Sequence, residues 1–411
     1  MKAIPNEMQL KYYEEQVACF LHFGMNTFKD VEWGDGKASL EDFSLEYFDY
    51  DGYVKKIKEL GFRRLIFTAK HHDGFCMWDS KLTDYKVTNT KYGKDFLELL
   101  SKSCSKYDMD MGIYLSPWDV HEPSYGSGDQ YNKYYLGQIE EICQSGKYGN
   151  NGRFVEWWFD GAKDPEYKDQ IYDFFSWMNM VRKYNPDILM FGLGSYGGIH
   201  WVGNENGYAT DPNVSRLPKD ILDIDYRSMF KVNEDGHDKY QWSIAEADTC
   251  TTNGWFWHDN EIMKSQEELI DIYFNSVGKG AVLLLNIACD KQGKIPDALF
   301  ERLLQVKQEI ISLFCNSVDC LPNVHVKGNI MTLDYILDEM EIIRVIELRE
   351  DIKKGQNIVD CTIYADDIQI VNFQSVGYVR LEKFHKLKVK NIRIIITFNG
   401  EFNLKEVKLY R

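Results

Sequence analysis

Short apolar runs alternate with amphipathic segments through the first three quarters of the chain. The strand-like runs cover residues 18–23, 64–69, 111–116, 154–160, 188–192, 241–245 and 281–287. Segments with helical spacing of their apolar residues lie between and after them, at 53–60, 95–107, 131–145, 169–184, 266–277 and 297–314. Nearly continuous apolar strands between amphipathic helices indicate a parallel sheet that is covered on both faces.

The number of strand–helix units separates two architectures. Seven or eight units over about 310 residues predict a (β/α)8-type barrel. A doubly wound sheet is the alternative, but no G-x-G-x-x-G motif follows the first strand. The glycine-rich stretch 193–212 interrupts the alternation and is interpreted as a flexible lid over a site.

The pattern changes near residue 315. Short segments with period-two alternation follow, separated by turns such as 327–329 (KGN) and 399–400 (NG). All ten Trp lie between Trp33 and Trp257, so the last part of the chain has none. We predict two domains, a catalytic (β/α)8-like barrel over residues 1–315 and a C-terminal β-sandwich over residues 316–411.

Composition and charge narrow the class of ligand. The 411 residues carry a formal net charge of −16, which disfavours a partner with a phosphate backbone. A small or neutral substrate is expected, with no nucleic-acid partner. No stretch has the length of a membrane span, and the first residues lack the basic segment followed by an apolar one that a secretory signal has. The nine Cys form no C-x-x-C pair and are interpreted as reduced core thiols, with disulfides or a zinc site as the alternatives. A cytoplasmic location is therefore expected, and secretion would require a signal segment ahead of these residues.

Polar and aromatic residues stand where the predicted strands end. His22 stands at the end of the first strand, His71 and His72 follow the second, Tyr114 belongs to the third and Asp160 ends the fourth. In barrels of this type the active site lies at the carboxyl ends of the strands. Aromatic side chains with hydrogen-bonding edges can stack on sugars and bind their hydroxyls. The rim is therefore predicted to bind a sugar.

Glycoside hydrolysis requires two carboxyl groups, one ionised and one protonated. Asp160, followed by Gly161, is the candidate for the ionised group, although the same position could serve as a helix N-cap. Glu205 is the only Glu in the glycine-rich stretch and is the candidate acid. Glu246, at the end of the run 241–245, is the rival, and sequence spacing does not decide between them.

Two further features could be explained by a purely structural role. His71 and His72 could be metal ligands or core residues, but neither H-x-H nor H-E-x-x-H accompanies them. We favour hydrogen bonding to sugar hydroxyls and expect no metal. The segment 255–258 (WFWH) could be core, but we predict that Trp255 forms an apolar wall of the sugar pocket.

Several of these runs resemble glycoside hydrolase family 29, the α-L-fucosidases. The resemblance lies in residues 70–78 (KHHDGFCMW), together with 22–24 (HFG), 32–34 (EWG) and 158–161 (WFDG), in the same order. It implies a (β/α)8-like barrel followed by a β-sandwich, a retaining mechanism and no cofactor. It also implies that Asp160 is the nucleophile. The residues that match the family's fucose pocket are His22, Glu32, Trp33, His71, His72, Tyr114 and Trp158.

The acid/base varies in position across that family. Residues 201–205 (WVGNE) and 118–126 (WDVHEPSYG) are similar to a branch with regiospecific activity, in which the acid/base, here Glu205, lies on a loop. Members often carry Arg at the position of Val120 and Asp at that of Glu122. The resemblance implies α-1,3/1,4-linked fucose in branched Lewis-type oligosaccharides or glycoconjugates as substrate. A fucosidase of relaxed specificity, a non-catalytic glycan-binding protein and a metal-dependent barrel hydrolase are the alternatives.

Overall fold

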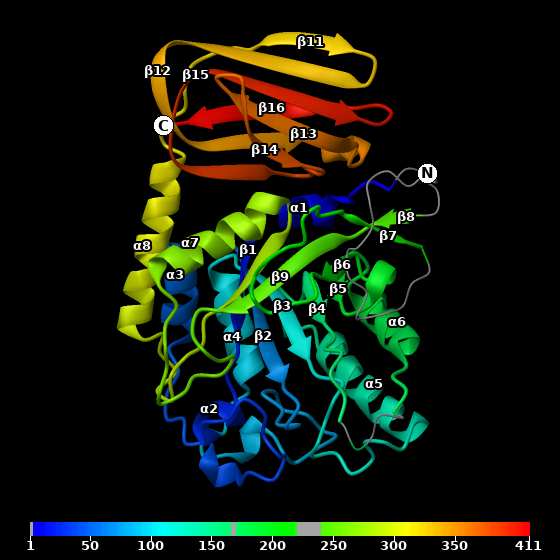
Figure 1. Ribbon diagram of the computed structural model, residues 1–411. Helices are drawn as coiled ribbons and strands as arrows, with labels where there is room; N and C mark the ends of the chain where they lie inside the picture. The colour runs from blue at the N-terminus through cyan, green and yellow to red at the C-terminus, as the bar shows by residue number, and fades with distance from the viewer. Residues whose placement is uncertain (1–2, 165, 167–169, 220–239) are drawn as a thin grey trace.

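The computed structural model describes residues 3–164, 166, 170–219 and 240–411. Eight parallel strands form one sheet in the order β5-β4-β3-β2-β1-β10-β9-β6 (Figure 1). A parallel bridge between Met190 and Gly198 joins the two edge strands and nearly closes the barrel. The predicted (β/α)8-like fold is therefore confirmed. The strands are β1 (Val17–Leu21), β2 (Arg64–Lys70), β3 (Asp110–Leu115), β4 (Glu156–Trp158), β5 (Leu189–Phe191), β6 (Ile199–Trp201), β9 (Ile244–Cys250) and β10 (Val282–Asn286).

Several of the helices begin where the sequence supplies a capping side chain. Asp49 and Asp95 accept hydrogen bonds from the first turns of α3 and α4, and Ser265 forms a capping box with Glu268 at α7. Gly61, with φ of 104°, ends α3 in the left-handed conformation that glycine adopts without strain. Among the described residues, no helix is long and apolar enough to cross a membrane. The helices are α1 (Glu7–Glu15), α2 (Met25–Lys29), α3 (Tyr50–Leu60), α4 (Phe96–Lys106), α5 (Asp129–Gln144), α6 (Phe174–Tyr184), α7 (Gln266–Asn275) and α8 (Asp297–Leu313).

Side chains alternate across each barrel strand and build two separate cores. On β1, Cys19 and Leu21 join the apolar cluster shared with the helices, whereas Ala18 and Phe20 belong to the cluster inside the barrel. This follows from the period of two along a strand. Residues at every second position therefore point to the barrel axis.

The chain after α8 forms an antiparallel sheet of six strands. Residues 330–336 of β12 pair with β11 and the late part of β15, and residues 345–350 pair with β16. Apolar side chains from β12 to β16 enclose a second core. Residues 330–336 and 345–350 lie along one long strand, β12, whose pairing with β15 shifts register between Ile336 and Glu341. The strands are β11 (Asn323–Lys327), β12 (Ile330–Glu350), β13 (Ile358–Ala365), β14 (Ile368–Phe373), β15 (Arg380–Phe398) and β16 (Leu404–Tyr410).

This sheet packs at one end of the barrel. Arg380 of β15 forms a bidentate ion pair with Asp211, with distances of 2.9 and 3.0 Å, and Asn213 N donates to Ser375 Oγ. In Figure 1 the arrowheads of β2 and β3 point away from the antiparallel sheet. The carboxyl ends of these barrel strands therefore lie at the opposite end of the barrel from the sheet.

Three predictions from the sequence pattern differ from the structure. The glycine-rich stretch 193–212 is not a simple lid, because it contains the barrel strand β6. The run 241–245 is also not one strand: it is divided between a short strand, β8 (Tyr240–Trp242), paired with β7 (Arg216–Pro218), and the longer β9. The predicted helix over 169–184 begins at Phe174, and residue 169 lies outside the described residues.

All nine cysteines are free, which confirms the expectation of reduced thiols. Seven are buried, but Cys315 is exposed and Cys320 is half-buried. The interpretation as core thiols is therefore wrong for Cys315, which lies in the connection between α8 and β11, whereas Cys320 packs against the edge of the core of the antiparallel sheet.

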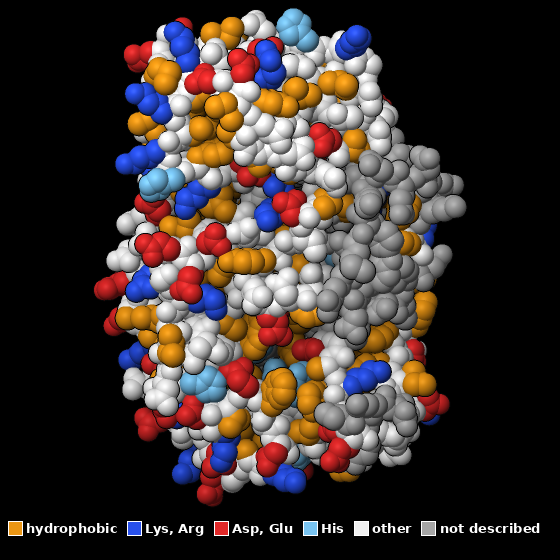
Figure 2. All heavy atoms as spheres, in the orientation of Figure 1, with side chains coloured by type: hydrophobic (Ala, Val, Ile, Leu, Met, Phe, Trp, Pro, Cys, Tyr) orange, Lys and Arg blue, Asp and Glu red, His pale blue; other side chains and the backbone are white. Residues whose placement is uncertain are grey.

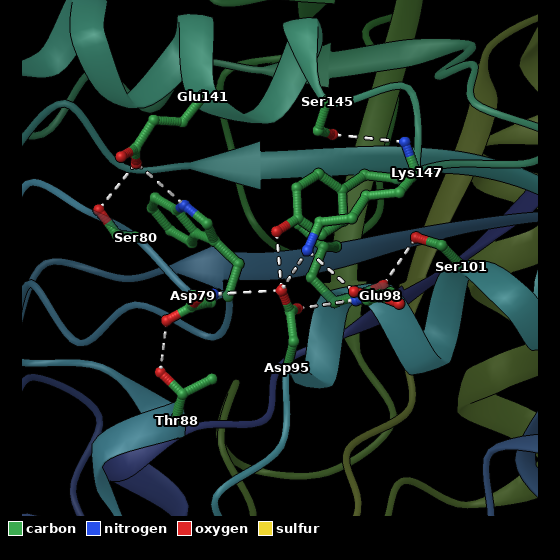
Figure 3. Close-up of polar contacts among 12 residues, drawn as sticks. Asp79, Ser80, Thr88, Asp95, Glu98, Ser101, Glu141, Ser145 and Lys147 are labelled. Atoms are coloured by element: carbon green, nitrogen blue, oxygen red, sulfur yellow. Dashed lines mark hydrogen bonds and ion pairs between the residues drawn. The ribbon is translucent and has the colours of Figure 1, made fainter.

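The loop that follows β2 is tied to α4 and α5 by a polar network (Figure 3). Glu141 of α5 accepts hydrogen bonds from Ser80 Oγ at 2.8 Å and from the indole of Trp78 at 3.3 Å. Asp95 caps α4 and also accepts from Tyr148 OH at 2.7 Å. These contacts hold the outer part of the loop whose first residues are His71 and His72.

A buried charge network closes the end of the barrel beneath α1. Arg64 donates to Glu15 at 2.9 Å and to Glu156 at 2.8 Å, and its guanidinium stacks on the ring of Tyr12. All three charged side chains are almost completely buried. Removing one partner of a buried pair leaves an uncompensated charge.

We expect Arg64→Met to lower the free energy of unfolding by about 3 to 5 kcal/mol, because Glu15 and Glu156 would lose their counter-charge. Urea unfolding followed by tryptophan fluorescence measures this loss. The matched control is Arg63→Met at the exposed neighbouring position, which should change stability by less than about 0.5 kcal/mol. Equal effects of the two substitutions would contradict a structural role for the network.

Candidate active site

A cavity of about 650 Å³ opens at the carboxyl ends of the barrel strands. In the lower half of Figure 2, histidine, acidic and hydrophobic side chains gather on the face shown. The cavity brings together ten of the eleven residues that the sequence singled out, all except Glu246. The ten are His22, Glu32, Trp33, His71, His72, Tyr114, Trp158, Asp160, Glu205 and Trp255. No residue of 316–411 lines the cavity, so the antiparallel sheet does not form a wall of this site.

Asp160 lies two residues after the end of β4, on the strand face that points to the barrel axis. Its Oδ2 accepts a hydrogen bond from Tyr114 OH at 2.8 Å, and its Oδ1 accepts one from Ala162 N, also at 2.8 Å. His72 Nε2 lies 3.8 Å from Oδ2. The carboxylate is therefore held in one orientation while it faces the cavity.

The three histidines of the rim are held neutral. Burial lowers the pKa of His22 to about 3 and also lowers the pKa values of His71 and His72, the latter in spite of nearby Asp160. A neutral imidazole can donate from one ring nitrogen and accept at the other.

Neighbouring side chains indicate which ring nitrogen of His22 and of His72 carries the hydrogen. His22 Nδ1 lies 2.9 Å from Asn286 Oδ1. Ser116 Oγ donates to the carbonyl of Trp118 and so accepts from His72 Nδ1 at 2.7 Å. Both histidines then carry hydrogen on Nδ1, which leaves Nε2 free to accept from a sugar hydroxyl.

Glu32, in the loop after α2, connects this loop to the segment after β9. Its carboxylate accepts hydrogen bonds from Trp255 N at 3.0 Å and Phe256 N at 3.2 Å, and it lies 2.5 Å from His258 Nε2. Burial lowers the pKa of His258, but Glu32 and Asp30 outweigh this effect and raise it. Glu32 thus positions Trp255, whose ring forms part of the cavity wall.

Glu205 stands four residues beyond β6, at the mouth of the cavity. Trp255 Nε1 donates to its Oε2 at 3.4 Å, and the side chain keeps contact with solvent. Partial desolvation and the negative charges of Asp160 and Glu32 raise the pKa of Glu205, although the bond from Trp255 opposes this. A carboxyl group with a raised pKa beside an ionised one suits general acid catalysis.

Glu246, the rival acid, does not line the cavity. It lies within β9, fully buried, and accepts hydrogen bonds from Trp158 Nε1 at 2.7 Å and from Tyr12 OH. Desolvation raises its pKa to about 6. Trp158 in turn stacks on Phe191 with 3.6 Å between ring centres. The contacts of Glu246 orient the indole that forms the floor of the cavity.

Sequence reasoning missed several cavity residues, above all Asp248. The predicted strand ends at residue 245, whereas β9 continues to Cys250 and places Asp248 inside the strand. The alternation of Glu246 and Asp248 with Ala245 and Ala247 was the available signal, since it matches a strand with an inward polar face. Other cavity residues that were not singled out are Phe20, Phe191, Thr249, Cys250, Thr252, Asn253 and Lys264.

Within the described ranges, no group of three or more His, Cys, Asp or Glu residues has the geometry of a metal site. The Nδ1 atoms of the adjacent residues His71 and His72 contact different side chains. His71 Nδ1 lies 3.4 Å from Asn26 Nδ2, whereas His72 Nδ1 meets Ser116 Oγ.

The sequence is similar to known proteins over most of its length. A family model described as α-L-fucosidase matches residues 5–308. The protein α-L-fucosidase 1 of Arabidopsis thaliana is 36% identical over 319 residues, which cover 77% of this chain and 62% of that protein. The match therefore spans less than two thirds of the plant protein.

Solved structures match the whole chain. A crystal structure described as SpGH29 has a TM-score of 0.91 and 33% identity, covering 100% of this chain and 99% of the other. A GH29 fucosidase of Ruminococcus gnavus in complex with fucose has a TM-score of 0.90 and 31% identity, covering 100% and 95%. The likeness therefore includes both the barrel and the antiparallel sheet.

Proposed function

We propose, from the premise that this chain belongs to the α-L-fucosidase family of glycoside hydrolases, that it is a retaining exo-α-L-fucosidase. The observation that carries the proposal is the pairing of Asp160 and Glu205 in one cavity, surrounded by neutral histidines and aromatic rings. A cavity closed at its base by the barrel core suits a terminal sugar. The fucosidase of Ruminococcus gnavus in complex with fucose supports this choice of sugar.

The reaction proceeds as a double displacement. Asp160 attacks the anomeric carbon of the fucosyl unit, while Glu205 donates its proton to the departing glycosidic oxygen. The bond from the anomeric carbon to that oxygen breaks, and a covalent fucosyl-enzyme forms. Glu205, now ionised, removes a proton from water, which attacks the same carbon and releases Asp160. Two inversions return the original configuration.

The remaining cavity residues bind and orient the sugar. His22 and His72 present Nε2 as acceptors for sugar hydroxyls, and Tyr114 holds the carboxylate of Asp160 through its hydroxyl. Trp158 and Trp255 supply apolar surface for the methyl group of the deoxysugar. Fixed donors and acceptors of this kind stabilise the charge that develops in the transition state.

For the substrate, we propose α-1,3/1,4-linked fucose on branched Lewis-type glycans. Glu205 lies on a short loop directly after β6 at the cavity mouth, where a leaving sugar would sit. Trp33, 69% exposed, lies beside Trp118 with 6.4 Å between ring centres. The exposed indole of Trp33 at the mouth offers a stacking surface to the sugar that carries the fucose.

Fucose release from two substrates tests this proposal. A Lewis-type trisaccharide and a simple aryl α-L-fucoside are each incubated with the purified protein and EDTA, and NMR follows the configuration of newly released fucose. We expect α-L-fucose first, with the trisaccharide preferred. Preference for the aryl fucoside would favour the relaxed alternative, and initial β-L-fucose would exclude retention. Folded protein without activity on either substrate would favour a glycan-binding protein or a metal-dependent enzyme.

A further inference from the structure

Asp248 is a third carboxyl group in the cavity, in addition to the pair at Asp160 and Glu205. It lies on β9 two residues after Glu246, so both side chains lie on the face that points into the barrel. β9 runs from the barrel floor toward the rim, which places Asp248 one step nearer the opening than Glu246. Only 2% of Asp248 is exposed, and that surface lines the cavity.

The two carboxyl oxygens of Asp248 have different surroundings. Oδ1 accepts a hydrogen bond from Trp201 Nε1 at 2.7 Å. Across the part of the chain that the structure describes, Oδ2 has no hydrogen-bond partner on any other residue. A nearly buried polar oxygen without a partner costs free energy unless a ligand or water satisfies it. The cavity is the one direction from which such a partner can come.

The surroundings favour the protonated form of this carboxyl group. Desolvation, followed by the negative charges of Glu205 and Asp160, raises the pKa of Asp248 to about 8, while the bond from Trp201 opposes the shift. Lys264 also lines the cavity, but its Nζ donates to the carbonyl of Thr252. Glu246 and Cys250 lie on the same strand, and the other titratable groups that line the cavity are Glu32, His22, His71, His72 and Tyr114.

We propose that Asp248 is a substrate-binding residue that donates a hydrogen bond from Oδ2 to an oxygen of the bound fucosyl unit. This inference rests on the proposed function of the cavity. A protonated carboxyl group keeps Oδ1 as the acceptor for Trp201 and places its hydrogen on Oδ2. Since His22 and His72 present acceptors on the other side of the cavity, Asp248 adds a donor that can bind a sugar oxygen acting as acceptor.

Calorimetric titration of L-fucose tests this donor directly, because product binding needs no turnover. Asp248→Ala removes the donor and should weaken fucose binding by about tenfold near neutral pH. Asp248→Asn keeps an oxygen for Trp201 and an N–H in place of the hydroxyl, so binding should stay within about threefold of the original. If the two variants bind equally weakly, or both bind as the original protein does, the proposal is wrong.

The pH dependence of fucose binding shows whether Asp248 acts as a hydrogen-bond donor or as an acceptor. Between about pH 6 and about pH 9, ionisation of Asp248 removes the donor, so fucose binding should weaken about fivefold more in the original protein than in Asp248→Asn. Glu205 ionises in both proteins, and the comparison cancels its effect. Equal pH dependence in the two proteins would overturn the proposal.

Trp201→Phe distinguishes direct contact from an effect through the indole. This variant removes the donor to Oδ1 but leaves Oδ2 in place, so fucose binding should weaken less than in Asp248→Ala. An equal loss would mean that Asp248 acts only by positioning Trp201. If the folded original protein binds no fucose at either pH, the proposed function itself is wrong. If the original protein binds fucose and the Asp248 variants bind it equally well, only this inference is wrong.

Discussion

Asp160→Asn is expected to lower kcat/KM for fucoside hydrolysis by a factor on the order of 10⁴ or more. The amide has nearly the shape of the carboxylate, and its oxygen can still accept from Ala162 N or Tyr114 OH. It cannot form the covalent bond to the anomeric carbon. Since the cavity wall stays intact, L-fucose should still bind, with a Kd within about tenfold of the original. Steady-state kinetics and calorimetric titration measure the two quantities.

A small external nucleophile shows whether Asp160 forms the covalent bond. Azide should restore part of the turnover in Asp160→Ala and give β-L-fucosyl azide, because a single displacement inverts the anomeric carbon. The matched control is Asp187→Asn, which makes the same charge change on an exposed residue just before β5 and should leave kcat/KM unchanged. Turnover above a tenth of the original in Asp160→Asn would refute the role of nucleophile.

The residues of the rim could be predicted because they follow the strands in sequence. His22, the pair at 71 and 72, and Asp160 each come directly after an apolar run, and parallel strands bring their carboxyl ends to one side of the sheet. The local pattern alone therefore predicts that these side chains lie together, although they are far apart along the chain.

The interior of the barrel could not be predicted in the same way. Arg64, Glu156 and Glu246 stand within strands where apolar residues are expected, and their burial depends on partners from distant segments. β6 is only three residues long, which is too short to show a period among glycines. These features follow from tertiary contacts, so the pattern placed Glu246 at a strand end and did not single out Asp248.

Glu205→Gln is expected to lower kcat/KM for the trisaccharide by about 10² to 10⁴, because a sugar alcohol is a poor leaving group without a proton. An aryl fucoside with an acidic leaving group needs little protonation, so the first step should lose less than about tenfold. In Glu205→Ala the second step lacks its base. Azide should then restore turnover and give α-L-fucosyl azide, since it attacks the covalent intermediate and completes a second inversion.

The pH profile distinguishes Glu205 from Glu246. Glu205 must be protonated to act, so kcat/KM of the original enzyme should fall as the pH rises through its raised pKa. Glu205→Gln should lose this alkaline limb and keep only the smaller decline that ionisation of Asp248 causes. Glu246→Gln is the matched comparison. Its amide oxygen can still accept from Trp158 Nε1, so we expect a kcat loss below about tenfold and an unchanged limb. If the limb disappears in Glu246→Gln but persists in Glu205→Gln, the acid lies on β9, and the loop after β6 serves only the leaving sugar.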